Sequence, residues 1–236
     1  MVDFLEIGRV NKKGYTEIYP KFVLKRRSED LMIRGGDFYA IWLEDRGLWS
    51  TDEMDLTNLV DLALKAKAEE IRADGTVVKV KYMWDAESGM IDQWHKFCQR
   101  QCRDNFHMLD EKLIFSNQEL KKTDYASKRL NYPLEEGSTP GWDKLMSVLY
   151  SPDERHKIEW AIGSIITGDS KDLQKFMVLY GPPGSGKSTV LNIIQQLFDG
   201  YYSVFDAKAL GNPSNSFALE SFKTNPLVAI QHDGDL

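Results

Sequence analysis

A glycine-rich octapeptide constrains the fold of this 236-residue chain more than any other feature. It reads Gly181-Pro182-Pro183-Gly184-Ser185-Gly186-Lys187-Ser188 and fits the phosphate-loop pattern at every fixed position. A continuous apolar run at 176–180 precedes it, and an amphipathic pattern over 187–198 comes after it. Such an apolar run is typical of a strand buried on both faces of a parallel sheet. The sequence therefore predicts a strand, a phosphate-binding turn and a helix, in that order.

The loop's residue types have separate chemical reasons. Glycines let the backbone wrap so that several N–H groups point at one anion, and the helix N-terminus adds partial positive charge. The Lys187 ammonium reaches the β- and γ-phosphates, and the Ser188 hydroxyl is a Mg²⁺ ligand. We expect ATP to contact the loop and the first helical turn, namely Gly181, Pro182, Pro183, Gly184, Ser185, Gly186, Lys187, Ser188 and Thr189.

A second apolar run, at 226–230, ends close to two acidic residues, Asp233 and Asp235. An acidic side chain after a buried strand beside a phosphate loop can hold Mg²⁺ and polarise the attacking water. Asp233 and Asp235 are thus candidate metal ligands and, with Lys187, candidate catalytic residues. The pattern does not choose between the two acids, and a polar turn is the alternative interpretation.

Helix signals surround these strands. Ser151-Pro152-Asp153-Glu154 combines a capping box with proline at the first helical position, and Gly168 ends that helix. The order helix, strand, helix, strand favours an α/β domain over 141–236 with a parallel sheet. The stretch 135–141, rich in Glu, Gly, Ser and Pro, is the best linker candidate, and the N-terminal domain is placed at 1–140.

The N-terminal domain is predicted to be mainly helical, with a small β-hairpin. The hairpin comprises 38–43, a turn at 44–47 and a short return strand at 48–49. Apolar residues at three- and four-residue steps predict helices over 52–72 and 88–104. The whole chain is therefore expected to be an α/β protein.

Composition excludes several classes of protein. A hydrophobic fraction of 42% argues against wholesale disorder, and no apolar run reaches the length of a membrane span. Two cysteines and an acidic N-terminus without a secretory signal favour a reducing cytoplasm. The net charge of −6 excludes coating of nucleic acid by bulk charge. Two local basic stretches, 8–34 and 121–129, could contact DNA phosphates, although solvated surfaces are the commoner interpretation.

Four potential zinc ligands, His95, Cys98, Cys102 and His107, lie close together in the sequence. Residues 91, 95, 98 and 102 have helical spacing, which is typical of a packed face rather than a metal site. Tryptophans such as Trp42 and Trp49 are likewise expected in the core more often than on a stacking platform.

Residues 129–236 resemble the helicase part of phage and poxvirus-type primase-helicases, which belong to helicase superfamily 3. The resemblance is carried by 129–133, 140–144, 162–168 and 175–181, and by the short gap from the phosphate loop to Asp233. It implies an AAA+-like, Mg²⁺-dependent ATPase that forms a homo-hexameric ring and unwinds single-stranded or forked DNA. A primase or polymerase of the same replication system, in a host-cell cytoplasm, is the implied partner.

The family's DNA-contacting hairpin, polar sensor and arginine finger would all lie beyond Leu236. We therefore expect this chain to represent an N-terminal portion that binds nucleotide but hydrolyses it poorly or not at all. No carboxylate cluster of a primase stands out. The alternatives are another phosphate-loop NTPase or kinase, and a non-enzymatic DNA-docking or assembly module with an inert ATPase remnant.

Overall fold

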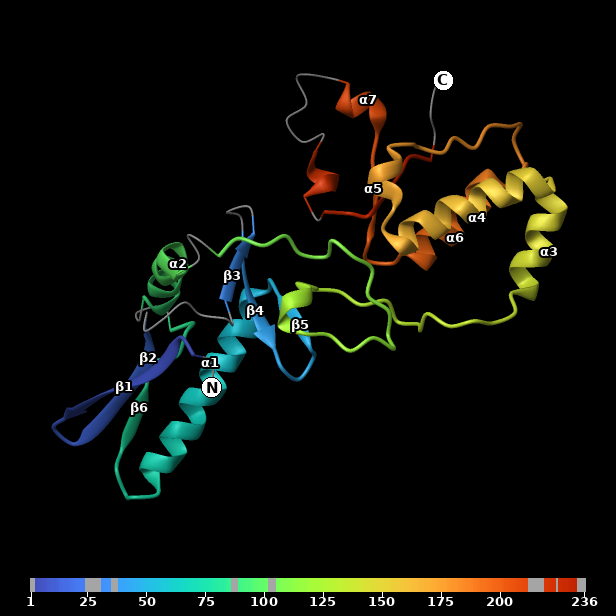
Figure 1. The fold of residues 1–236 in the computed structure, drawn as a ribbon. Helices are drawn as coiled ribbons and strands as arrows, with labels where there is room; N and C mark the ends of the chain where they lie inside the picture. The colour runs from blue at the N-terminus through green and yellow to red at the C-terminus, as the bar shows by residue number, and fades with distance from the viewer. Residues whose placement is uncertain are drawn as a thin grey trace. The chain divides into compact units, whose positions relative to one another are not determined.

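A computed structural model describes residues 3–23, 31–34, 38–85, 89–101, 105–211, 219–223 and 225–232. The chain divides into two compact units. Unit 1 comprises 1–109 and 120–127, and unit 2 comprises 110–119 and 128–236. Both contain helices and strands, which confirms the expected mixed α/β composition (Figure 1).

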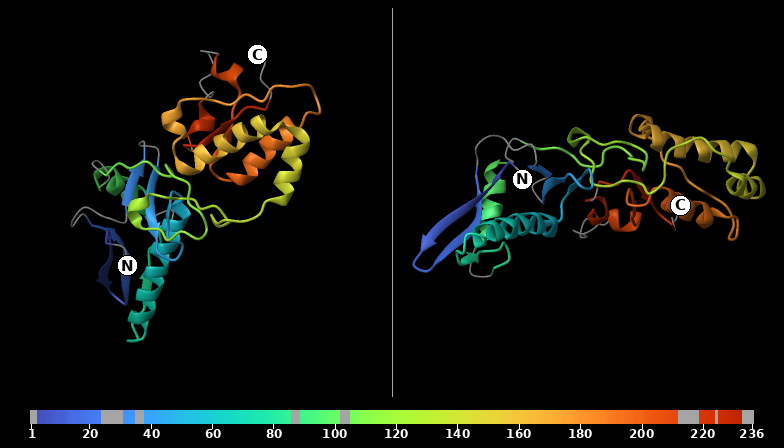
Figure 2. Two further views of the ribbon diagram at one scale, coloured as in Figure 1. Left: turned by 45° about the vertical axis from the view of Figure 1, so that its right-hand side comes forward. Right: turned by 90° about the horizontal axis from the view of Figure 1, so that it is seen from below.

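Unit 1 contains two three-stranded sheets. In the first, β1 (Leu5–Lys12) and β2 (Tyr15–Phe22) form a long antiparallel hairpin, and β6 (Val78–Val80) pairs parallel to β2. Figure 2 shows this hairpin from two further directions. The second sheet joins β3 (Leu31–Arg34), β4 (Phe38–Leu43) and β5 (Leu48–Ser50) in antiparallel order. The expected small hairpin is thus present, but the described part of unit 1 is not mainly helical.

Two helices cover the first sheet. Helix α1 (Glu53–Arg72) buries a stripe of apolar side chains that includes Val60, Leu64 and Ala68, and the helix predicted over 52–72 is confirmed. Helix α2 (Met90–Gln101) contributes an aromatic cluster in which the Trp94 ring lies 5.2 Å from Phe4 and 5.1 Å from Phe22. Cys98 is fully buried in the same core.

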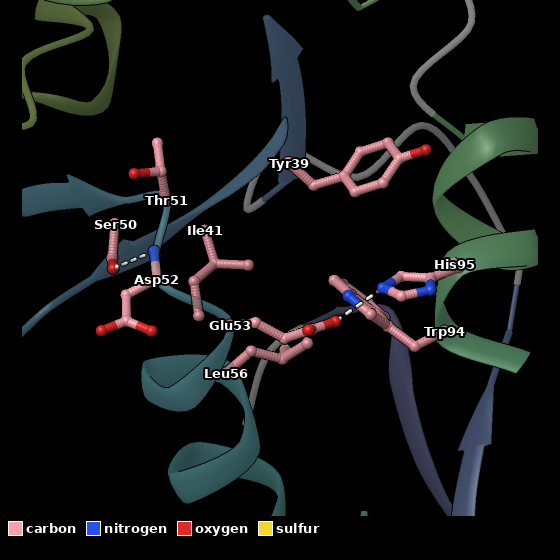
Figure 3. A pocket seen from close by; sticks show the side chains of 9 residues that line it. All are labelled: Tyr39, Ile41, Ser50, Thr51, Asp52, Glu53, Leu56, Trp94 and His95. Atoms are coloured by element: carbon pink, nitrogen blue, oxygen red, sulfur yellow. Dashed lines mark hydrogen bonds and ion pairs between the residues drawn. The ribbon is translucent and has the colours of Figure 1, made fainter. Parts of the chain in front are cut away.

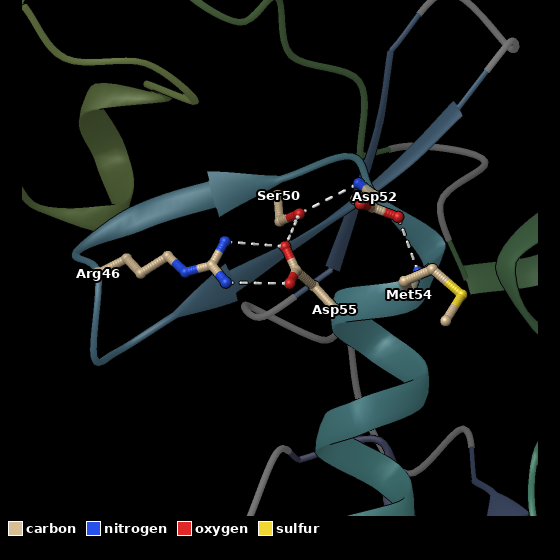
Figure 4. A network of polar contacts seen from close by, with 5 residues as sticks. All are labelled: Arg46, Ser50, Asp52, Met54 and Asp55. Carbon is tan, nitrogen blue, oxygen red and sulfur yellow. Dashed lines mark hydrogen bonds and ion pairs between the residues drawn. The ribbon is translucent and has the colours of Figure 1, made fainter.

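The start of α1 is fixed by polar contacts (Figure 4). The Asp52 carboxylate accepts a hydrogen bond from the Met54 amide at 2.8 Å, which caps the helix. Asp55 accepts from the Ser50 hydroxyl at 2.6 Å and from the Arg46 guanidinium at 3.1 and 3.2 Å. These bonds connect α1 to β5 and to the turn before it.

Unit 2 contains most of the remaining helices, and η1 (Lys122–Asp124) belongs to unit 1. The helices of unit 2 are α3 (Pro140–Leu149), α4 (Pro152–Thr167), α5 (Ser170–Leu173), α6 (Lys187–Leu197), α7 (Ala207–Leu210) and η2 (Glu220–Phe222). Strands β7 (Tyr202–Val204) and β8 (Val228–Ile230) pair in parallel, with Ser203 opposite Ala229. The core of the unit contains buried side chains from α3, α4, α6, β8 and the stretches 110–119 and 128–132, and Tyr202 of β7 packs against it.

Several predicted elements are confirmed and one is wrong. The helix after Ser151 ends at Gly168 and has the full capping box, and the strand near 226–230 forms as β8. The predicted buried strand at 176–180 does not form. Its residues pair with no strand among the described residues, and Phe176 and Tyr180 are 89% and 91% exposed.

Residues 128–140, placed in the N-terminal domain from the sequence, pack with unit 2. The Leu130 amide donates to the Ile114 carbonyl at 2.8 Å, and the Ser116 amide donates to the Tyr132 carbonyl at 3.0 Å. These bonds join the two stretches of unit 2 that precede α3. The expected linker at 135–141 therefore lies inside unit 2 rather than between the units.

Candidate nucleotide-binding site

The glycine-rich loop lies directly before α6, as its sequence predicted. Gly184 and Gly186 have φ angles of +80° and +83°, in the left-handed region that favours glycine. Gly186 is the residue before the first helical turn, and its carbonyl accepts from the Val190 amide at 3.1 Å. The loop thus leads its backbone into the positive end of a helix, which is the geometry that favours an anion.

Helix α6 is held by one apolar face. Val190 and Ile194 are buried in the core of unit 2, while Ser188 and Thr189 in the first turn are exposed. The buried side chains fix the helix axis, and the hydroxyls remain accessible to a ligand. The sequence pattern of apolar and polar positions is sufficient to explain this arrangement.

The Lys187 ammonium folds back over the loop. Its Nζ donates to the Gly181 carbonyl at 2.8 Å, to the Pro182 carbonyl at 2.9 Å and to the Ser185 hydroxyl at 3.2 Å. These three oxygens accept hydrogen bonds from the Lys187 ammonium, the group that the sequence predicts to bind phosphate. An ammonium carries three donors, so a phosphate could replace these partners without leaving the lysine unpaired.

Leu149, at the end of α3, packs against the loop. A Cβ added to Gly186 would lie 2.6 Å from Leu149 Cδ1. The backbone conformation therefore favours glycine at 186, and a larger residue there would also have to displace the Leu149 side chain. Sequence reasoning missed Leu149, because nothing in the local pattern relates it to a loop more than thirty residues later.

The second predicted half of the site lies outside the described residues. Both candidate acids, Asp233 and Asp235, come after the last described residue, His232. The His232 imidazole accepts from the Gln195 side-chain amide, with 2.8 Å between the two nitrogens, and this contact joins the end of β8 to α6. The choice between Asp233 and Asp235 stays open.

The zinc alternative gains no support from the described residues. Cys98 is buried, His95 contacts Glu53 at 2.7 Å, and the His107 ring stacks on Tyr125 with centroids 4.0 Å apart. Cys102 lies outside the described residues. Within the described part of the chain, no three His, Cys, Asp or Glu side chains gather as a metal site would require.

Trp42 and Trp49 are core residues, as expected. They are 6% and 3% exposed and pack edge to face with centroids 5.7 Å apart. The Trp49 indole N–H donates to the Lys122 carbonyl at 2.8 Å, which satisfies its polar atom. By contrast, Trp84 and Trp160 are about half exposed.

The two basic stretches contain paired charges. On the β1–β2 hairpin the Lys12 ammonium lies 2.8 Å from Glu17, and this hydrogen bond raises the pKa of Lys12 and lowers that of Glu17. In the second stretch the Lys128 ammonium lies 3.7 Å from Asp110. Residues 24–30, which include Lys25, Arg26 and Arg27, lie outside the described residues.

None of the helices in the described part of the chain combines the length and apolar character that a membrane crossing requires. Comparison of the chain with protein-family models, with curated proteins and with solved structures found no match.

Proposed function

We propose that this chain binds Mg-ATP through the loop at 181–188 and serves as the nucleotide-binding part of an ATP-dependent DNA helicase. One observation carries the nucleotide part of the proposal. Two left-handed glycines lead into the N-terminus of an eleven-residue helix, and the Lys187 ammonium lies over the loop's own oxygens. Backbone donors, helix dipole and ammonium together match a triphosphate.

The donor set also fits a magnesium ion. Ser188 presents an exposed hydroxyl on the first turn of α6, and Asp233 or Asp235 would supply the carboxylate. The ion would neutralise charge on the phosphates. Lys187 would exchange its bonds to the Gly181 and Pro182 carbonyls for bonds to phosphate oxygens, and the loop's amides would hold the nucleotide in place.

The largely exposed segment 176–180 favours ATP binding without rapid ATP hydrolysis. A strand that is paired with neighbours holds the residues after it rigidly, whereas this segment makes no such ladder among the described residues. Hydrolysis requires catalytic groups positioned within a fraction of an ångström. We therefore propose that this chain binds ATP tightly enough to measure but hydrolyses it slowly.

Isothermal calorimetry with Mg-ATPγS tests the nucleotide proposal. We expect the wild-type chain to bind one nucleotide and Lys187→Ala to lose at least about tenfold in affinity, because a charge-assisted contact is removed. Lys171→Ala, an exposed lysine 3.7 Å from Glu111 in the same unit, is the matched control and should bind like wild type. Equal binding by wild type and Lys187→Ala would reject the loop as the nucleotide site.

A labelled forked DNA tests the helicase part. The proposal expects the affinity for the fork to change between nucleotide-free protein and protein saturated with Mg-ATPγS, and this change to vanish in Lys187→Ala. An affinity for DNA that is the same with and without nucleotide, and the same in Lys187→Ala as in wild type, would instead favour a docking module. A small-molecule phosphate acceptor that accelerates ATP consumption would favour a kinase.

A further inference from the structure

Unit 1 contains a cavity of about 210 Å³ that belongs to none of the predicted sites. Strands β4 and β5, the start of α1 and helix α2 contribute its walls (Figure 3). A cavity of this volume has room for several water molecules or a small organic group. It lies in a different unit from the phosphate loop, so a ligand could bind there whether or not the chain binds nucleotide.

The floor of the cavity is apolar. Ile41, Leu56 and Trp94 line it and are 3%, 2% and 2% exposed. They come from β4, α1 and α2, three elements of one packed core. An apolar floor of this kind favours a hydrocarbon stem over bound water.

The rim is polar and carries negative charge. Figure 3 shows the Glu53 carboxylate directed toward the His95 ring, and the His95 Nε2 lies 2.7 Å from Glu53 Oε1. Asp52 also lines the cavity, and its carboxylate accepts from the Met54 amide at 2.8 Å in the cap of α1. No lysine or arginine is among the described residues that line the cavity. The contact with His95 fixes one carboxylate oxygen of Glu53 and orients the side chain at the edge of the apolar floor.

We propose that this cavity binds a compact organic cation, an ammonium or guanidinium group on a short apolar stem. The stem would lie against Ile41 and Leu56, and the charged head would donate hydrogen bonds to Glu53. Carboxylates are acceptor-only when ionised, and guanidinium presents several donors in a fixed geometry that matches them. A phosphate or carboxylate ligand would place a like charge beside the Glu53 carboxylate. The same chemistry is available from a free amine and from a lysine or arginine side chain of a partner protein.

Saturation-transfer NMR with agmatine, a guanidinium on a butyl stem with a terminal amine, tests the proposal on the full chain. Glu53→Gln removes the charge but keeps an acceptor for His95, so the fold should survive. We expect it to weaken agmatine binding about tenfold or more, because a charge-assisted hydrogen bond is lost. The control Glu69→Gln lies on the exposed side of the same helix and should leave the affinity unchanged.

A second variant guards against misfolding. Thr51 lines the cavity and is exposed, so Thr51→Phe should obstruct the site without disturbing the core or the Glu53–His95 contact. We expect it to reduce agmatine binding as strongly as Glu53→Gln, with an unchanged near-ultraviolet circular dichroism spectrum. Glutarate, a dianion of similar length, should not bind.

The outcomes are distinct. Agmatine binding that is equal in wild type and Glu53→Gln, equal binding of glutarate, or the absence of saturable binding to folded wild type would each overturn the proposal. If arginine with both backbone ends blocked binds as well as agmatine, the site accepts a side chain of a partner. If agmatine binds and the blocked arginine does not, the site binds a small molecule.

Discussion

At the scale of single residues, Gly184 and Gly186 form a natural comparison. Both have left-handed φ angles, but a Cβ at 184 would meet nothing within 4 Å, whereas one at 186 would lie 2.6 Å from Leu149 Cδ1. Any substitution at either position carries the backbone strain. Only the substitution at 186 must also displace the Leu149 side chain, at the end of α3.

We therefore predict that Gly184→Ala destabilises unit 2 by about 1–2 kcal/mol, the cost of a left-handed alanine. Gly186→Ala should cost more, because the Leu149 side chain must move as well, and it should weaken Mg-ATPγS binding further. Urea unfolding followed by circular dichroism, with calorimetry on the same samples, measures both effects. Equal losses of stability in the two variants would show that the Leu149 side chain moves aside at no measurable cost in stability.

The residues of the loop were predictable because their chemistry is local. A glycine needed for a positive φ and a lysine at a helix N-terminus are visible in eight consecutive letters. The partners of those residues were not predictable. The contact of Lys187 with the Gly181 and Pro182 carbonyls depends on the detailed conformation of the loop, which the spacing does not give. The position of Leu149 depends on tertiary packing.

At the scale of elements, α4 begins with a complete capping box. The Glu154 amide donates to the Ser151 hydroxyl at 3.4 Å, and the Ser151 amide donates to the Glu154 carboxylate at 2.8 Å. The Ser151 hydroxyl also donates to that carboxylate at 2.7 Å. These side-chain and backbone hydrogen bonds hold the pKa of Glu154 below its ordinary value of 4.5.

We predict that Ser151→Ala lowers the stability of unit 2 by about 1 kcal/mol at neutral pH, as loss of a helix cap does. The pKa of Glu154 is lower in the folded state than in the unfolded state. Ionised Glu154 therefore stabilises the fold at pH values above its ordinary pKa, and this stabilisation is lost as pH falls through its folded-state pKa. The difference between Ser151→Ala and wild type should therefore shrink in acid. Thermal unfolding at neutral and strongly acidic pH measures this.

Ser147→Ala is the matched control for this prediction, because the Ser147 hydroxyl is exposed within α3 and donates only to the Lys144 carbonyl one turn before it. Its stability should stay close to that of wild type at both pH values. A difference between Ser151→Ala and wild type that is the same in acid as at neutral pH would show that Glu154 does not depend on the cap.

The predictable and unpredictable elements differ in what stabilises them. Helix boundaries such as Ser151 and Gly168 are set by hydrogen bonds within a few residues, and the structure confirms them. A strand exists only when another strand lies beside it. The apolar run at 176–180 has the composition of a buried strand. Four of its five residues are nevertheless exposed, and it is unpaired among the described residues, because composition does not supply a neighbouring strand.

At the scale of the whole molecule, the division into units does not coincide with the polar stretch at 135–141. The stretches 110–119 and 128–139 pack with unit 2, and 120–127 packs with unit 1. Composition does not reveal that segments alternate between the two units along the chain. A stretch rich in Gly, Ser and Pro is typical of any exposed loop, whether or not the loop is a domain boundary. The apolar side chains that decide the matter are Leu113 and Phe115, in a run of only three apolar residues, and Leu130.

This packing predicts how fragments of the chain behave. A fragment of residues 141–236 lacks Leu113, Phe115 and Leu130, which are 7%, 3% and 2% exposed in the core of unit 2. It also lacks the Tyr132 hydroxyl that donates to the Leu197 carbonyl, and the Lys128 carbonyl that accepts from the Tyr201 hydroxyl at 2.8 Å. Burying three large apolar side chains contributes about 5–9 kcal/mol, which is comparable with the total stability of a small domain.

We therefore expect residues 141–236 to remain largely unfolded, whereas residues 110–236, which contain all of unit 2, should unfold cooperatively. Thermal melts by circular dichroism and the dispersion of amide proton shifts distinguish the two fragments. The control is Leu113→Ala within 110–236, which should lower the melting temperature without abolishing the transition, because one buried side chain is truncated rather than three removed. A cooperative melt of 141–236 near the temperature of 110–236 would place the boundary at the polar stretch and would make the earlier segments dispensable for the folding of unit 2.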